Sequence, residues 1–107
     1  MRNEQLKGHL DLLLLQVIAD RPAHGYQLAC ALRDRSRGAF DLPEGTVYPA
    51  LHRLEHQGLL ASAWDEDSPR RRRVYRITQD GHAALRAQRA EWRRFSHGIG
   101  AVLGAST

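Results

Sequence analysis

Cysteine is almost absent from this 107-residue sequence, which contains only Cys30. A single cysteine excludes an intrachain disulfide framework and is typical of a protein of the reducing cytoplasm. The residues around it, QLACAL, are apolar. We therefore expect a buried structural thiol and not a reactive one.

Long hydrophobic runs are also missing. The most apolar stretch, LDLLLLQVIA at 10–19, is interrupted by Asp11 and Gln16. It is shorter than the roughly 20 residues that a membrane-spanning helix needs. No secretory signal peptide is recognisable. These absences predict a cytoplasmic protein without membrane contact.

The common enzyme signatures are absent: the sequence has no P-loop, GxGxxG or GxSxG pattern. His52, Glu55 and His56 do spell H-x-x-E-H, which one class of zinc peptidases uses. Two histidines four residues apart on a helix can share a zinc ion, but a catalytic site needs a third ligand. The sequence does not identify a third ligand. Positions on the rim of the helix, beside its core residues, are the alternative explanation for the same side chains. We expect a binding protein that has no catalytic activity, metal or cofactor.

The charge balance favours a polyanionic partner. Sixteen Lys and Arg stand against 12 Asp and Glu, which gives a net charge of +4 and a pI near 10.0. Nucleic acid is the simplest such partner, and ordinary surface charge is the alternative. The length and the 42% hydrophobic content predict one globular domain.

The first third of the chain has helical periodicity. Apolar residues at positions 6, 10, 13, 14, 17 and 18 predict a helix over 3–20, capped by Asn3 and ended before Pro22. Leu12 and Leu15 lie off this stripe, so the helix needs partners on two sides. The core of the domain would cover one side, and a second subunit would cover the other.

Two further helices follow. One is predicted from His24 to about Ser36. In the other, Val47, Leu51 and Leu54 have the spacing i, i+4, i+7, and Gly58 ends the helix. Pro49 is tolerated only about one turn from the helix start, because backbone N–H groups there lack partners anyway. This helix should therefore begin within 44–46.

The periodicity then changes. Two short runs, 59–67 and 70–78, contain β-branched and aromatic residues and are separated by a turn rich in Asp, Ser and Pro, which predicts a β-hairpin. Thr78 caps a last helix, with Asp80 in its first turn. Mostly helical structure with a small β-hairpin is typical of a winged helix-turn-helix. We assign it to 1–78, with a C-terminal dimerisation helix and tail at 79–107, in one compact domain overall.

The last helix has an apolar seam. Leu85, Trp92 and Ile99 are spaced by sevens, and Phe95 and Val102 are also seven apart. This spacing resembles the a and d positions of a coiled coil. We expect the seam to pack against a second copy of the chain or another protein.

The third helix of a helix-turn-helix enters the major groove of DNA. Here its start offers Thr46 and Tyr48, and its outer face offers His52 and Arg53. Side chains alternate along a strand, so not every arginine of the hairpin tip can reach one target. We expect two to reach phosphates or a minor groove, and the others to be solvated or paired within 65–67. A solvated charge run is the alternative for these residues, which are Arg70, Arg71, Arg72 and Arg73.

Several segments resemble the PadR family of transcriptional regulators, in the order and spacing of that family. They are HGYQL at 24–28, EGTVYPALHRLEHQGLL at 44–60, RRRVYRIT at 71–78, Gly81, and EW at 91–92. The resemblance implies a homodimeric DNA-binding protein, usually a repressor, that binds a pseudo-palindromic operator in double-stranded DNA. It implies that the last helix packs with the first helix of the partner.

The resemblance also implies a short PadR subfamily without a larger C-terminal domain. Some short members bind flat aromatic compounds at the dimer interface through a tryptophan of the last helix. Trp92 occupies the matching place, with Phe95 about one turn later; filling the seam is the alternative role for Trp92. The main alternative function is a protein-interaction module that has lost specific DNA binding. RNA binding is disfavoured, because no RRM or KH signature is present.

Overall fold

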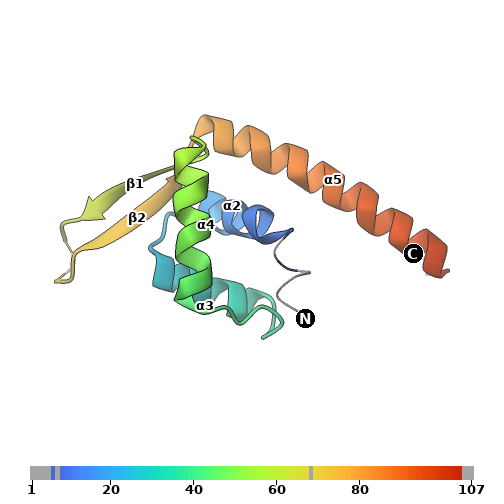
Figure 1. The fold of residues 1–107 in the computed structure, drawn as a ribbon, viewed down its shortest axis with the longest axis horizontal. Coiled ribbons are helices and arrows are strands. Elements are labelled where there is room, and N and C mark those ends of the chain that lie inside the picture. Colours follow the sequence, from blue (N-terminus) through green and yellow to red (C-terminus); the bar gives the residue numbers. More distant parts are fainter. Residues whose placement is uncertain (1–5, 7, 68, 105–107) are drawn as a thin grey trace.

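The computed structural model describes residues 6, 8–67 and 69–104. It has four long helices and a two-stranded antiparallel hairpin, as the sequence predicts (Figure 1). The elements in chain order are α2 (Leu10–Asp20), α3 (Gly25–Arg35), α4 (Glu44–His56), β1 (Leu60–Asp65), β2 (Arg72–Ile77) and α5 (Gln79–Leu103).

Helix α2 begins later than the sequence predicts. Gly8 and His9 form a turn ahead of Leu10, so a continuous helix over 3–20 is wrong at this point. Glycine inside a helix costs about 1 kcal/mol relative to alanine, and the turn still leaves Leu6 buried in the core. The predicted cap, Asn3, lies outside the described residues.

Helices α3 and α4 have the predicted ends. His24 caps α3, and α4 begins at Glu44 and stops two residues before Gly58, whose φ is +79°. Pro49 is the sixth residue of α4, just beyond the first turn. Its missing N–H would have donated to the Gly45 carbonyl, and both residues are exposed, so water can supply that hydrogen bond.

The core is formed by the inward sides of α2, α3 and α4 together with the hairpin. Leu15 is fully buried in it, although it lies off the apolar stripe of α2. The chain itself therefore covers part of the second apolar side of α2, which the sequence analysis assigned to a second subunit. Leu12 is only partly buried. The largest fully buried side chains are Tyr75, Leu14, Leu15, Ile18, Leu28, Leu51, Leu54 and Val47.

The hairpin is joined to the helices by an isolated bridge. Strands β1 and β2 pair from Leu60↔Ile77 to Asp65↔Arg72. On the other edge of β2, Ala23 N–H donates to the Tyr75 carbonyl at 3.1 Å, and Tyr75 N–H donates to the Ala23 carbonyl at 2.8 Å. Tyr75 is 1% exposed. The hairpin, which forms the wing of the fold, is thus attached to the segment just before α3 by backbone hydrogen bonds and by the buried ring of Tyr75.

Helix α5 packs against α2 and then extends beyond the rest of the molecule, away from the hairpin (Figure 1). Thr78 caps it by accepting a hydrogen bond from Gly81 N–H at 3.0 Å, as predicted. No helix within the described ranges is long and apolar enough to cross a membrane.

Gly81 is placed where α5 passes closest to the hairpin. A Cβ atom there would lie 2.1 Å from the Leu59 carbonyl oxygen. We expect Gly81→Ala to lower the free energy of unfolding by about 2 kcal/mol or more, because backbone must move to admit the methyl group. Chemical denaturation at fixed protein concentration measures this change.

Gly98→Ala is the matched control on the same helix. No atom lies within 4 Å of a Cβ at Gly98. Alanine should leave the stability unchanged or raise it by about 0.5–1 kcal/mol through helix propensity. Equal unfolding midpoints for Gly81→Ala and the wild type would contradict the close approach of α5 to Leu59.

Candidate nucleic-acid interface

Helix α4 divides into a core side and an outer side. Val47, Ala50, Leu51 and Leu54 are buried. The opposite side is exposed and carries His52 together with Gly45, Pro49 and His56. Of the four predicted α4 contacts, His52 therefore faces directly away from the core, while the other three occupy the flanks or pack locally.

Tyr48 is half-buried because its ring lies over the start of α3. A Cβ atom at Gly25 would lie only 2.5 Å from Tyr48 Cζ, so glycine is needed for this close packing. The Tyr48 ring centroid is 6.4 Å from that of His52. The tyrosine therefore fixes α4 on α3 and also borders the outer side of α4.

Arg53 lies on the flank of α4 that faces α2, where it forms an ion pair with Asp11. Thr46 and Arg53 line a shallow hollow with Leu6, Leu10 and other apolar side chains. Arg53 is about half exposed, at 49% of its side chain. The guanidinium of Arg53 is thus accessible to solvent, but it is already paired with the carboxylate of Asp11.

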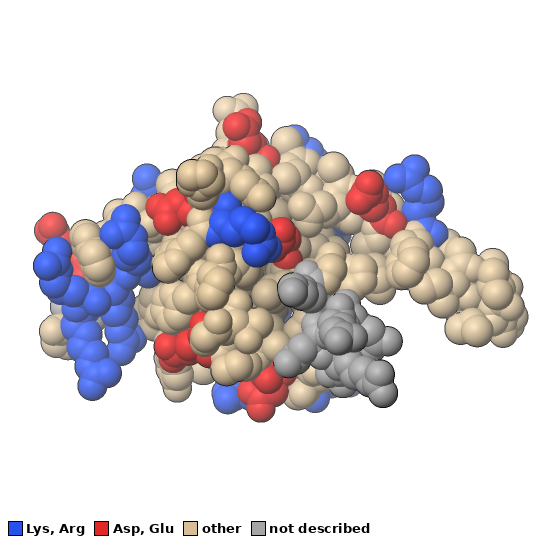
Figure 2. Space-filling view, viewed as in Figure 1, with Lys and Arg blue, Asp and Glu red and all other residues tan. Residues whose placement is uncertain are grey.

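The arginines of the hairpin are not an unstructured charge run. Figure 2 shows Lys and Arg side chains gathered over the hairpin, at the left of the molecule. Arg72 and Arg73 belong to β2, and Arg70 and Arg71 precede it. The guanidinium carbons of Arg71 and Arg73 each lie 4.8 Å from the ring centroid of Trp64. Trp64 is 47% exposed.

A hydrogen-bond chain connects the hairpin with α4. Arg73 Nε donates to Ser62 Oγ at 2.9 Å, and Ser62 Oγ donates to Glu55 Oε2 at 2.5 Å. Glu55 of the H-x-x-E-H pattern thus turns toward the wing, whereas His52 and His56 are exposed on the outer side. Within the described ranges, no three His, Cys, Asp or Glu side chains are grouped as metal ligands.

Arg72 lies beside the N-terminal cap of α3. Its Nη1 is 3.1 Å from His24 Nε2, and Gln27 N–H approaches His24 Nδ1 at 3.4 Å. Burial lowers the pKa of His24 below 6.5, and the charge of Arg72 lowers it further, while Asp65 and Glu44 oppose the shift. The neutral ring is therefore favoured, and in it Nδ1 can accept the hydrogen bond from Gln27 N–H.

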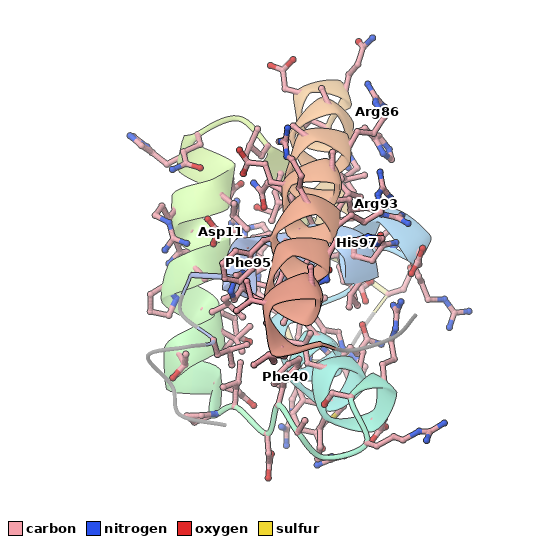
Figure 3. All side chains as sticks on the ribbon, turned by 90° about the vertical axis from the view of Figure 1, so that its right-hand side faces the viewer. Asp11, Phe40, Arg86, Arg93, Phe95 and His97 are labelled. Carbon is pink, nitrogen blue, oxygen red and sulfur yellow. The ribbon has the colours of Figure 1, made fainter. Side chains whose placement is uncertain are left out.

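A second surface is formed by the apolar side of α5. Leu85 is buried in the core of the single chain, whereas Trp92, Phe95 and Ile99 are 43%, 54% and 43% exposed. The predicted seam therefore divides into one core residue and an exposed remainder. In Figure 3, Asp11 and Phe95 lie on one side of α5, and Arg86, Arg93 and His97 on the other.

A hollow of about 520 Å³ separates this end of α5 from α2. Trp92 meets His9 edge to face, with ring centroids 5.1 Å apart, and Phe95 follows at 6.0 Å from Trp92. The hollow is lined by Gly8, His9, Asp11, Leu12, Gln88, Glu91, Trp92 and Phe95.

Helices α2–α4 followed by the hairpin define a winged helix-turn-helix protein. The profile of the PadR-like family of transcriptional regulators matches residues 14–87, which is more than half of the chain. The chain belongs to this family, whose members are transcriptional regulators and not enzymes.

Individual relatives agree with this assignment. The chain is 44% identical over 78 residues to the transcriptional regulator Rv3488 of Mycobacterium tuberculosis, and the match covers 73% of this chain and 70% of that protein. A PadR family regulator from Eggerthella lenta is similar in structure, with a TM-score of 0.83 and 37% identity over 96% of this chain and 88% of that one. A PadR-like regulator from Bacillus cereus gives a TM-score of 0.82 at 27% identity, over 94% and 96% of the two chains.

Sequence reasoning missed four residues that shape this surface: Asp11, His24, Ser62 and Trp64. Only Trp64 had a usable signal. An aromatic residue in the first strand of a hairpin, near an arginine run in the second, predicts cross-strand contact once the register is known. The other three depend on contacts between elements distant in sequence.

His24 gives the wing a pH dependence that can be measured. Because the folded protein lowers the pKa of His24 below 6.5, the unfolded chain binds the proton more tightly. Stability should therefore fall as the pH drops below 6.5 toward the lower pKa of the folded protein, and the contribution of His24 should be constant above 6.5. Protonation would also place a second cation beside Arg72 and remove the acceptor for Gln27 N–H.

His24→Asn isolates this contribution, because asparagine can cap a helix but does not titrate. We expect urea denaturation to show a weaker loss of stability on acidification for His24→Asn than for the wild type. Parallel pH profiles for the two proteins would remove His24 from this role.

Proposed function

We propose that the protein is a homodimeric transcriptional repressor that places α4 in the major groove of a pseudo-palindromic operator. The observation that carries this proposal is the link from Arg73 through Ser62 to Glu55. It fixes the basic hairpin beside the helix whose outer side is exposed. DNA presents the matching surfaces: base edges in the groove for α4, and phosphates along its edge for the wing.

The exposure and the packing of each side chain support particular contacts with DNA. His52 would meet base edges, because it points directly away from the core. Tyr48 would use its ring edge or hydroxyl while it keeps its packing on Gly25. Thr46 and Arg53 would meet the backbone on the α2 flank, with Arg53 exchanging Asp11 for a phosphate. On the wing, phosphate contacts would come from two of the four arginines Arg70, Arg71, Arg72 and Arg73.

The exposed seam of α5 supports a homodimer. Trp92, Phe95, Ile99 and Val102 are each more than 40% exposed. A second copy that packs its own α5 and α2 against them would bury this apolar surface. The two α4 helices would then meet half-sites about one DNA turn apart. Residues 1–78 would form the DNA-binding unit and 79–107 the dimerisation segment, in a protein of the cytoplasm.

Release by a flat aromatic effector is a further part of the proposal. Trp92, His9 and Phe95 border the hollow between α2 and α5, which can hold an aromatic ring. Such a compound would relieve repression only if it bound the DNA-incompetent arrangement of the dimer more tightly than the competent one.

Selection of genomic DNA fragments by the purified protein tests operator binding. We expect one palindromic site, and we expect His52→Ala to bind it about 5- to 100-fold more weakly through the loss of a base contact. His97→Ala is the matched control, because His97 is also exposed but lies on α5. Tyr48→Phe keeps the ring packing and tests the hydroxyl alone.

Retention of only random fragments, released at modest salt, would contradict operator binding and favour the protein-interaction module. Wild-type affinity in both His52→Ala and Tyr48→Phe would place a different surface against the bases.

Trp92→Asp tests the dimer. A carboxylate in the middle of an apolar interface is costly to bury, so we expect a monomer at concentrations where the wild type is a dimer. Arg93→Asp adds the same side chain to the opposite side of α5 and should leave the dimer intact. Sedimentation velocity separates the two states, and a dimer for Trp92→Asp would contradict the assigned interface.

A further inference from the structure

Trp64 is the exposed aromatic residue of the wing, and its position has two unusual features. The register of the hairpin places it directly opposite Arg73, and Arg71 lies two residues earlier in the chain, just before β2 begins. Both guanidinium groups are within 4.8 Å of its ring centroid, inside the range of a cation–π interaction. One ring therefore holds two positive charges.

Among the described residues, no carboxylate lies within ion-pair distance of Arg71 or Arg73. Two guanidinium groups held at the same ring raise the local positive charge, and an anion that binds beside them offsets it. A phosphate has oxygens that can accept from both guanidinium groups at once.

Arg73 is also fixed in direction. Its Nε–H is used by Ser62 Oγ, which in turn donates to Glu55 of α4. A guanidinium has five N–H donors, so the four on Nη1 and Nη2 remain for another acceptor. The indole of Trp64 and the hydroxyl of Ser62 thus hold the guanidinium of Arg73, and the Ser62–Glu55 hydrogen bond connects it to α4.

We propose that Trp64 is a positioning residue that holds the guanidinium groups of Arg71 and Arg73 side by side as one binding site for the DNA backbone. This inference rests on the proposed DNA-binding function. It assigns to Trp64 a role distinct from base reading: it acts through the two arginines and organises them before DNA arrives. Preorganised donors lose less conformational entropy on binding than free arginine side chains do.

The test uses a mixed-sequence DNA duplex, because a backbone site is independent of sequence. Trp64→Leu keeps a bulky apolar side chain and the net charge but removes the π face. We expect it to weaken binding about tenfold and to make the dependence of log K on log salt shallower by about one unit. Trp64→Phe retains an aromatic face and should bind within about threefold of the wild type.

A double-mutant cycle separates positioning from a structural role. In a background of Arg71→Gln and Arg73→Gln, Trp64→Leu should cause no further loss of affinity. An equal loss in both backgrounds would overturn the inference, because Trp64 would then touch DNA itself or support the hairpin. Arg76→Gln, on the opposite face of β2, controls for the loss of charge alone.

NMR and circular dichroism test the positioning role of Trp64 without a measurement of DNA affinity. In proton NMR, the δ-methylene protons of Arg71 and Arg73 should show ring-current shifts that disappear in Trp64→Leu, while far-UV circular dichroism stays the same. Unshifted protons in the wild type would overturn the positioning role even if Trp64→Leu failed to fold. No salt-dependent binding by the wild type would overturn the proposed function, whereas normal wild-type binding unaffected by Trp64→Leu would overturn this inference alone.

Discussion

The two backbone hydrogen bonds between Ala23 and Tyr75 set the arrangement on which the rest of the surface depends. They attach β2 to Ala23, two residues before α3 begins, and the buried ring of Tyr75 holds the hairpin against the helices. With β2 fixed there, Arg72 lies beside the His24 cap, and Ser62 of β1 reaches Glu55 of α4. This bridge adds backbone hydrogen bonds to the packing of β1 against α4 and of β2 against α2.

Helix α2 connects the two candidate surfaces. On one flank, Asp11 holds Arg53 of α4, and on the other, His9 meets Trp92 of α5. Asp11 also lines the hollow beside Trp92. A change in how α5 packs, whether through a second subunit or through a bound compound, would therefore act on the same short helix that positions α4. This proximity gives the proposed effector release a physical route, since only a few side chains separate the hollow from Arg53.

The sequence predicted the architecture well because each element had a local signal. Thr78 capped the last helix, Gly58 ended α4, and a polar turn separated two strands of the right composition. The error at the start of α2 has the same local origin, because the leucine periodicity continued through Gly8 and hid the turn. Leu85 shows a second limit: its heptad spacing could not reveal that it lies in the core of one chain while Trp92 is exposed.

The candidate site was only partly predictable. The outer position of His52 follows from helical periodicity, and the basic hairpin follows from composition. The partners that hold the arginines do not, because Asp11 is 42 residues from Arg53 and His24 is 48 from Arg72. Side chains that meet across such separations are brought together by the packing of the whole domain, which no single stretch of sequence encodes.

Hydroxyl-radical footprinting on a selected fragment tests the central claim most directly. The account predicts backbone protection with two-fold symmetry: one protected segment in each half-site, about one helical turn apart, with further backbone protection beside each from the wing. A single unsymmetrical patch, or protection spread evenly along the fragment, would contradict a dimer that presents two α4 helices to an operator.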